Sequence, residues 1–400
     1  MNSKEIIDLT EQNCFHVYNR FNVVFDHGDG VTLYDVEGKA YLDFASGIGV
    51  NAFGYNNKKF NDTITRQLGK LYHISNLYYH PMLAEASKKL CEVSKMDKAF
   101  FTNSGAEAVE GAIKTAKKYA YNKNNRSGYG IVAMDSSFHG RTVGALSVTG
   151  TEAYRTPFLP LMDKVDFATF NDLGSVKDAV DDDTCAIIVE PVQGEGGVTP
   201  ANKEFLEGVR ALCDKKDILL IFDEIQCGMG RTGSMYACHG YGVKPDILLT
   251  AKALGGGLPI GAFLVTDKVA KSSLTPGDHG TTYGGNPLCT AAVKASIEIM
   301  TADGLLENVN SLTPYLESKL DEVVKDCKCA KSHRGKGFMQ GIVLDESVKA
   351  GDVVKACLEK GLVVLSAGGN VLRLLPPLVI SMADIDKAIA IIKEVLAVEQ

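Results

Sequence analysis

An acid and a lysine follow two short apolar runs near the middle of the chain. The runs, residues 218–222 and 247–249, are rich in β-forming side chains, which is typical of buried strands in a parallel sheet. Asp223 follows the first run directly, and Lys252 comes shortly after the second. Because parallel strands end at one edge of a sheet, we expect the carboxylate and the amine to lie close together. A pyridoxal phosphate (PLP) site needs this pair: the lysine forms a Schiff base, and the acid keeps the pyridine nitrogen protonated.

Simpler explanations exist for the same stretch. A strand that ends in Asp-Glu is common, and a lysine beside glycines is often part of a solvated loop. The segment GMGRTG, residues 228–233, also matches the G-x-G-x-x-G dinucleotide fingerprint. We expect no dinucleotide site there, because the glycines begin five residues after the strand and no helical apolar pattern follows them.

Other strand ends carry polar side chains of their own. A strand that ends at Thr102 is followed by a helix start, where backbone N–H groups could bind an anion or could simply be capped. Strands and helices alternate over residues 99–265, which predicts a doubly wound parallel sheet with ligands beyond the carboxyl ends of its strands. The residues expected at that edge are Ser104, Phe138, Arg141, Glu190, Glu195, Asp223 and Lys252.

The segments on either side of this sheet predict a division into domains. Residues 30–44 form two alternating strands around a turn at 36–39, which indicates a hairpin. After residue 280 a long helix and a mixture of strands and helices follow. We expect an N-terminal segment (1–60) that packs with a small α+β domain (295–400), and a large cofactor-binding domain (61–294) between them.

Composition excludes several classes of protein. The 400 residues are 45% hydrophobic and 23% charged, which is ordinary for a globular protein. The net charge of −7 argues against nucleic acid as a partner. No apolar run reaches the ~20 residues of a membrane span, and the N-terminus has no signal-peptide core, so we expect a cytoplasmic protein. The ten cysteines are scattered without zinc spacing, and we expect free thiols and no metal site.

A set of segments in this chain resembles the class III (ω-) aminotransferases of PLP fold type I. The segments are SGAEA, FHGRT, EPVQGEGG, DEIQCGMGRTG, TAKALGGGLPIGA, HGTTYGGNPL and VLRLLPPL, and they span most of the chain in the family's order. Within the family, HISNLYY (73–79) and FHGRTVGALSVTG (138–150) are most similar to members that transfer the δ-amino group of N-acetylornithine to 2-oxoglutarate.

The resemblance implies which residues hold the cofactor. Lys252 would carry the Schiff base, and Asp223 would contact the pyridine nitrogen. The other expected contacts are Gln226 at the phenolic oxygen, Phe138 on the ring face, Ser104, Gly105 and Ala106 at the phosphate, and Thr282 at the phosphate of the neighbouring subunit. A homodimer with shared sites follows from the role of Thr282.

The resemblance also implies how substrates are bound. Arg141 would hold the substrate α-carboxylate with its planar fork. Glu195 would act as a gate: it would pair with Arg373 when 2-oxoglutarate or glutamate binds, and meet the amine end of the other substrate when released. Tyr18 would lie on the substrate side.

Three positions depart from the family's pattern. Val109 stands where Asn is usual, Tyr55 replaces a His, and Asn22 replaces a common Pro. None of them belongs to the expected chemistry, so they affect only the placement of the first helix and the hairpin.

Several alternative functions remain open on the sequence. Related substrates are succinylornithine, succinyl-diaminopimelate, ornithine and 4-aminobutyrate. Ile48 stands where ornithine δ-aminotransferases carry Tyr, which disfavours ornithine but not 4-aminobutyrate. A mutase or decarboxylase on the same fold would not need Arg141 together with Glu195 and Arg373. A non-catalytic descendant would not be expected to keep Lys252.

Overall fold

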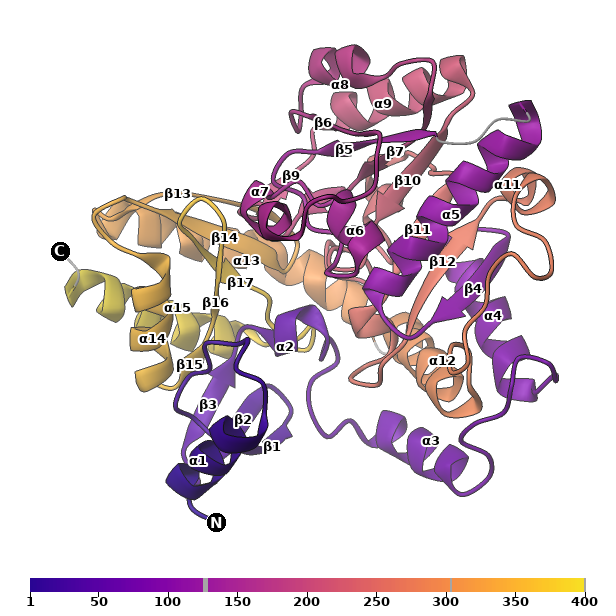
Figure 1. Ribbon diagram of the computed structural model, residues 1–400. Coiled ribbons are helices and arrows are strands. Elements are labelled where there is room, and N and C mark those ends of the chain that lie inside the picture. Colours follow the sequence, from indigo (N-terminus) through magenta and orange to yellow (C-terminus); the bar gives the residue numbers. More distant parts are fainter. Residues whose placement is uncertain (125–128, 303, 399–400) are drawn as a thin grey trace.

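The computed structural model describes residues 1–124, 129–302 and 304–398, and its largest sheet lies in the right-hand body of Figure 1. Within these residues the sheet has seven strands, in the order β4-β12-β11-β10-β7-β5-β6. They are β4 (Lys98–Thr102), β5 (Gly130–Met134), β6 (Val165–Ala168), β7 (Thr184–Val189), β10 (Leu219–Asp223), β11 (Ile247–Thr250) and β12 (Gly261–Val265). Neighbours run parallel except at β12, which is antiparallel to β4 and β11. The predicted, mostly parallel sheet is confirmed, and β6 and β12 are strands that we did not predict.

Alternate residues of each central strand pack against different helices. In β10, Leu219 and Ile221 join the cluster of α5 (Gly105–Asn124), whereas Leu220 and Phe222 join the cluster of α9 (Lys203–Lys216). A strand covered on both faces has to be apolar throughout, which explains the continuous apolar runs in the sequence.

Shorter elements complete the large body, and several of them connect strand ends to helices. They are α4 (Pro81–Ser94), α6 (Val143–Ser147), α7 (Glu152–Arg155), η1 (Thr156–Phe158), α8 (Leu173–Ala179), the β8 (Val192–Gln193) and β9 (Thr199–Pro200) pair, α10 (Ala237–Tyr241), η2 (Lys252–Leu254) and α11 (Asp267–Ser272). Helices α3 (Lys58–Leu68) and α12 (Pro287–Ala302) pack together, and α12 also contacts α4.

A smaller body, at the left of Figure 1, contains the N-terminal segment and the last described helix of the chain. Its antiparallel sheet, in the part of the chain that the structure describes, has the order β13-β14-β17-β16. Its elements are β13 (Ala330–Lys336), β14 (Met339–Leu344), β16 (Leu365–Ala367), β17 (Val371–Leu374), α13 (Leu305–Asp326), α14 (Ala350–Glu359) and α15 (Met382–Val398).

The N-terminal segment joins this smaller body through a strand pair. The predicted hairpin is present as β2 (Thr32–Asp35) and β3 (Ala40–Asp43), with β1 (Phe25–Asp29) on its outer side. Strand β3 pairs in parallel with β15 (Leu362–Val363). Helices α1 (Ser3–Asn13) and α2 (Ser46–Gly49) flank the hairpin in sequence. The domain limits at residues 60 and 294 stay a prediction. Among the described helices, none has the length and apolar character needed to cross a membrane.

Candidate active site

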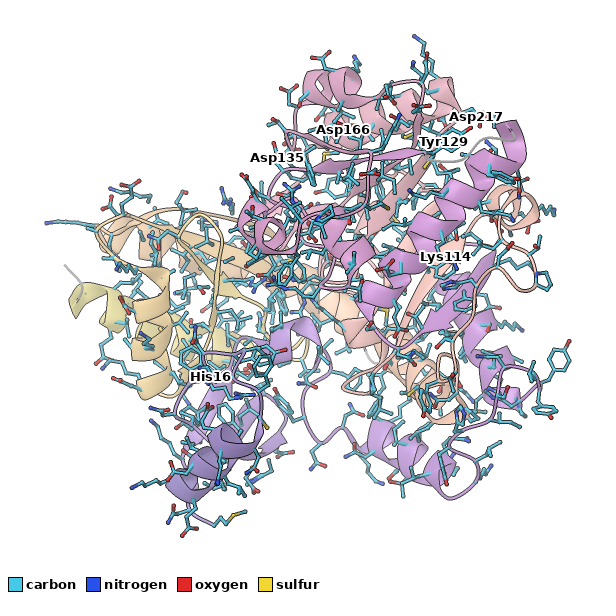
Figure 2. The ribbon with its side chains drawn as sticks, in the orientation of Figure 1. His16, Lys114, Tyr129, Asp135, Asp166 and Asp217 are labelled. Carbon is cyan, nitrogen blue, oxygen red and sulfur yellow. The ribbon has the colours of Figure 1, made fainter. Side chains whose placement is uncertain are left out.

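A cavity of about 450 Å³ lies where β10 and β11 end. The polarity of the sheet can be followed in Figure 2, where Tyr129 marks the amino end of β5 and Asp135 its carboxyl end. The predicted site residues in the cavity lining are Ser104, Gly105, Ala106, Phe138, Arg141, Glu190, Asp223, Gln226 and Lys252. A volume of this size is typical of a cleft that binds a small molecule or cofactor.

Lys252 provides the amine of this cavity. It comes two residues after β11, and its side chain is half-buried. Its backbone φ is 48°, a value that residues other than glycine rarely adopt. Burial lowers the pKa of Lys252 to about 8, and the positive charge of Arg373 contributes to the lowering. The negative charges of Glu195 and Asp223 oppose it. With this pKa, roughly a tenth of the lysine is neutral and nucleophilic at pH 7, far more than for an ordinary lysine.

Asp223 is held in place by His139, a residue for which the sequence pattern predicts no role. Asp223 ends β10 and is buried, with its Oδ2 2.7 Å from Nδ1 of His139. Burial alone would lower the pKa of His139, but the hydrogen bond to Asp223 and the negative charges of Asp223 and Glu190 together outweigh it and raise that pKa. Nε2 of His139 has no partner among the described residues. The neighbouring Glu224 instead accepts the N–H groups of Ala237 and Cys238.

Glu190 is a second buried group whose role the sequence did not reveal. One of its carboxylate oxygens accepts the backbone N–H of Phe138 at 3.1 Å, and the other accepts that of Gly194 at 3.3 Å. Burial raises the pKa of Glu190 to about 7. The carboxylate therefore connects the loop of Phe138 to the loop that carries Glu195.

The start of α5 offers free donors to an anion. Ser104 Oγ accepts the N–H of Glu107, which leaves the N–H groups of Gly105 and Ala106 without partners inside the helix. The helix dipole adds positive potential at this end. Gly140 allows the loop of Phe138 to approach, because a Cβ there would lie 2.8 Å from the Cβ of Ala106.

The predicted gate pair is present beside the cavity. Arg373 Nη1 lies 2.5 Å from Glu195 Oε1 and 3.0 Å from Gln226 Oε1. Burial would raise the pKa of Glu195, but Arg373, with smaller contributions from Lys252 and Gln226, outweighs burial and lowers that pKa. Because Arg373 belongs to β17, the smaller body reaches the cavity through this cluster.

Two predicted site residues lie apart from this cavity. The side chains of Tyr18 and Thr282 are exposed, and neither lines the cavity of the single chain. Their roles stay predictions. The GMGRTG segment is also absent from the lining: its Arg231 is buried and donates to the backbone carbonyls of Phe338 and Pro376.

The chemistry of the lining fits PLP. Lys252 supplies an amine, and Asp223 supplies a carboxylate oriented by a histidine. The unpaired N–H groups at the start of α5 suit a phosphate, and Phe138 supplies an aromatic ring.

Known proteins match the chain over nearly its whole length. Residues 15–396 match the family model described as aminotransferase class-III. The acetylornithine aminotransferase of Clostridium acetobutylicum is 46% identical over 387 residues, which cover 96% of this chain and 99% of that protein. The acetylornithine aminotransferase of Methanocaldococcus jannaschii is 45% identical over 395 residues, 99% of this chain and 98% of that protein.

Solved structures agree in fold. The ornithine aminotransferase of Toxoplasma gondii has a TM-score of 0.95 at 29% identity, covering 100% of this chain and 96% of its own. The acetylornithine aminotransferase of Elizabethkingia anophelis has a TM-score of 0.88 at 32% identity, with 99% of each chain covered.

Proposed function

The chain belongs to the class-III aminotransferase family and is a PLP-dependent aminotransferase, and we propose that N-acetylornithine is its amino donor. The reaction would transfer the δ-amino group to 2-oxoglutarate, giving N-acetylglutamate 5-semialdehyde and glutamate. The observation that carries the chemistry is the single cavity that Lys252 and Asp223 line together. The observation that favours the substrate is the name shared by the relatives of highest identity reported above.

The backbone does not discriminate between donors, since ornithine and acetylornithine aminotransferases share this fold. Side chains must therefore decide. Ile48 is exposed, and Val50, two residues later, lines the cavity. An aliphatic side chain at 48 offers no hydrogen bond to the free α-ammonium of ornithine, which favours a donor whose α-nitrogen is acylated and uncharged.

Each residue of the cavity has a defined task in this proposal. When bound, PLP would supply an electron sink for the reacting carbon and an aldehyde carbon that carries the amino group between the two substrates. Lys252 attaches the cofactor and, as a neutral amine, moves the proton at the reacting carbon. Asp223, oriented by His139, keeps the pyridine nitrogen protonated. The start of α5 holds the phosphate.

Substrate binding involves three charged residues. Arg141 binds the α-carboxylate of the donor. Glu195 is paired with Arg373 in this structure, which is the arrangement proposed for the binding of 2-oxoglutarate, and its release would free the carboxylate for the amine end of the donor. We expect Glu195→Ala to impair the N-acetylornithine half-reaction more than the 2-oxoglutarate half-reaction, because only the former uses the released carboxylate.

The wider setting of the enzyme is part of the same proposal. We infer a cytoplasmic homodimer that acts in arginine biosynthesis, with Thr282 of each subunit completing the phosphate site of the other. The exposure of Thr282 supports this role, since a residue that serves a second subunit must be accessible on the first.

A donor panel tests the substrate. kcat/KM for N-acetylornithine, N-succinylornithine, ornithine and 4-aminobutyrate should be measured with 2-oxoglutarate, following glutamate. We expect ornithine to be at least roughly tenfold to a hundredfold poorer than N-acetylornithine, because an unpaired buried polar group costs about 1–3 kcal/mol and a charged one costs more. If ornithine or 4-aminobutyrate is better than both acylated donors, the substrate assignment is wrong, while the aminotransferase assignment stands.

A further inference from the structure

Arg141 lies against an aromatic residue that the sequence did not single out. Its Cζ is 3.8 Å from the centroid of the Tyr154 ring, and 5.3 Å from that of Phe138. The two rings meet edge to face, with centroids 6.2 Å apart. The guanidinium therefore has aromatic contacts on two sides, and the nearer is with Tyr154.

Apart from these two rings, no contact given for the described residues restrains the guanidinium group of Arg141. Arg141 is exposed, and no carboxylate in the described ranges forms an ion pair with it. A long side chain in this setting would sample many rotamers. Stacking on an aromatic face restricts those rotamers but leaves the N–H groups at the edge of the guanidinium plane free to donate.

Tyr154 is itself well placed to serve as a rigid support. It belongs to α7, which contacts α6 and lies on the side of the large body that faces the smaller one (Figure 1). The next residue, Arg155, has its Cζ 4.0 Å from the ring centroid of Phe167 in β6. This contact attaches α7 to the sheet, so the backbone that carries the half-buried ring of Tyr154 is held in place.

We propose that Tyr154 is a positioning residue that presents Arg141 to the α-carboxylate of the donor. It contributes to the preference of the enzyme for donors that carry this carboxylate, because an arginine already ordered loses less entropy on binding. The inference rests on the role proposed above for Arg141.

Two donors that differ only in the carboxylate isolate the effect: N-acetylornithine and N-acetyl-1,4-diaminobutane. The measured quantity is the ratio of their kcat/KM values. We expect Tyr154→Leu to lower this ratio roughly three- to tenfold, the range of a partly exposed cation–π contact. The lower kcat/KM for N-acetylornithine should come from a higher KM with little change in kcat, because the carboxylate is bound equally in the ground state and the transition state.

Two further variants separate positioning from general damage. Tyr154→Phe keeps the ring face and should restore most of the ratio. In an Arg141→Met background, Tyr154→Leu should leave the ratio unchanged, because the group that it positions is gone.

The outcomes distinguish this inference from the proposed function. If the wild-type enzyme uses both donors equally well, the role of Arg141 fails, and that of Tyr154 fails with it. If the wild-type enzyme discriminates but Tyr154→Leu retains the full ratio, only the inference about Tyr154 is overturned. An equal loss for both donors, or no recovery in Tyr154→Phe, also overturns it.

Discussion

At the scale of single residues, the charge of Lys252 depends on opposing neighbours. Burial and Arg373 lower the pKa of its amine, whereas Glu195, Asp223 and Glu190 raise it. The gate pair therefore also controls the charge of the amine. Arg373 stabilises the neutral form of Lys252, and Glu195 stabilises the charged form.

This balance gives a pH dependence with a defined sign. After removal of PLP, the rate at which added PLP recombines should rise with pH through about 8, where the Lys252 amine becomes neutral. Arg373→Met removes a positive neighbour, so the ammonium is less disfavoured and the midpoint should move to higher pH. Glu195→Gln removes a negative neighbour, so the midpoint should move to lower pH. Stopped-flow absorbance measures both, and shifts of the same sign in the two variants would contradict the account.

The site residues that the sequence predicted share one property. Asp223 and Lys252 follow apolar runs that could only be buried strands, so the edge of the sheet on which they meet was predictable. Glu190 also follows an apolar run and was expected at this edge, but its bond to the backbone of Phe138, 52 residues away, was not predictable. His139 gave no such signal, because its role depends on burial and on a contact with Asp223, 84 residues away. Tyr154 was missed because a four-residue helix has no recognisable periodicity.

At the scale of elements, α5 sets the position of the anion site, and its distance from the sheet depends on Gly111. A Cβ at Gly111 would overlap ring carbons of Phe263 in β12. Glycine therefore allows the helix to approach the sheet, despite its weak helix propensity.

Gly111→Ala should destabilise the protein by up to about 2 kcal/mol. The gain in helix propensity is at most about 1 kcal/mol, whereas overpacking against a rigid ring costs about 1–3 kcal/mol. Gly351→Ala in α14 is the matched control, because nothing lies within 4 Å of a Cβ there. Urea unfolding of both variants checks this, and a Gly111→Ala protein as stable as the control would refute the packing argument.

The direction of β12 and the pairing of β3 with β15 were not predictable from the sequence. The alternation of strands and helices predicted a parallel sheet, but β12 directly follows a glycine-rich loop and turns back beside β11 without a crossover helix. Its direction depends on that loop, whose path local sequence does not specify. The pairing of β3 with β15 joins segments more than 300 residues apart, so the sequence predicted that the two ends pack together but not which strands pair.

At the scale of the whole molecule, the single chain exposes apolar surface that a second copy could cover. Leu77, Tyr78 and Tyr79 are 85%, 62% and 103% exposed. Clustered exposure of this kind often marks an interface. The loop of Thr282 is nearby in the fold, since Asn76 donates to the carbonyl of Thr281.

Subunit mixing tests whether sites are shared. Lys252→Ala and Thr282→Glu should each be inactive, the second because a carboxylate repels the phosphate. In a mixed dimer, one site combines the intact Lys252 of one subunit with the intact Thr282 of its partner. Activity should therefore return after subunit exchange. Verified exchange without any recovered activity would show that each subunit has an independent site.

The central claim is that the enzyme stores an amino group between two separate substrates, and one measurement tests it directly. The PLP-loaded enzyme is mixed with N-acetylornithine alone, desalted, and then given 2-oxoglutarate. We expect about one glutamate per subunit from the wild-type enzyme, as a ping-pong transfer requires, and none from Lys252→Ala. Glutamate that forms only when both substrates are present together, or that forms equally well without Lys252, would contradict the account.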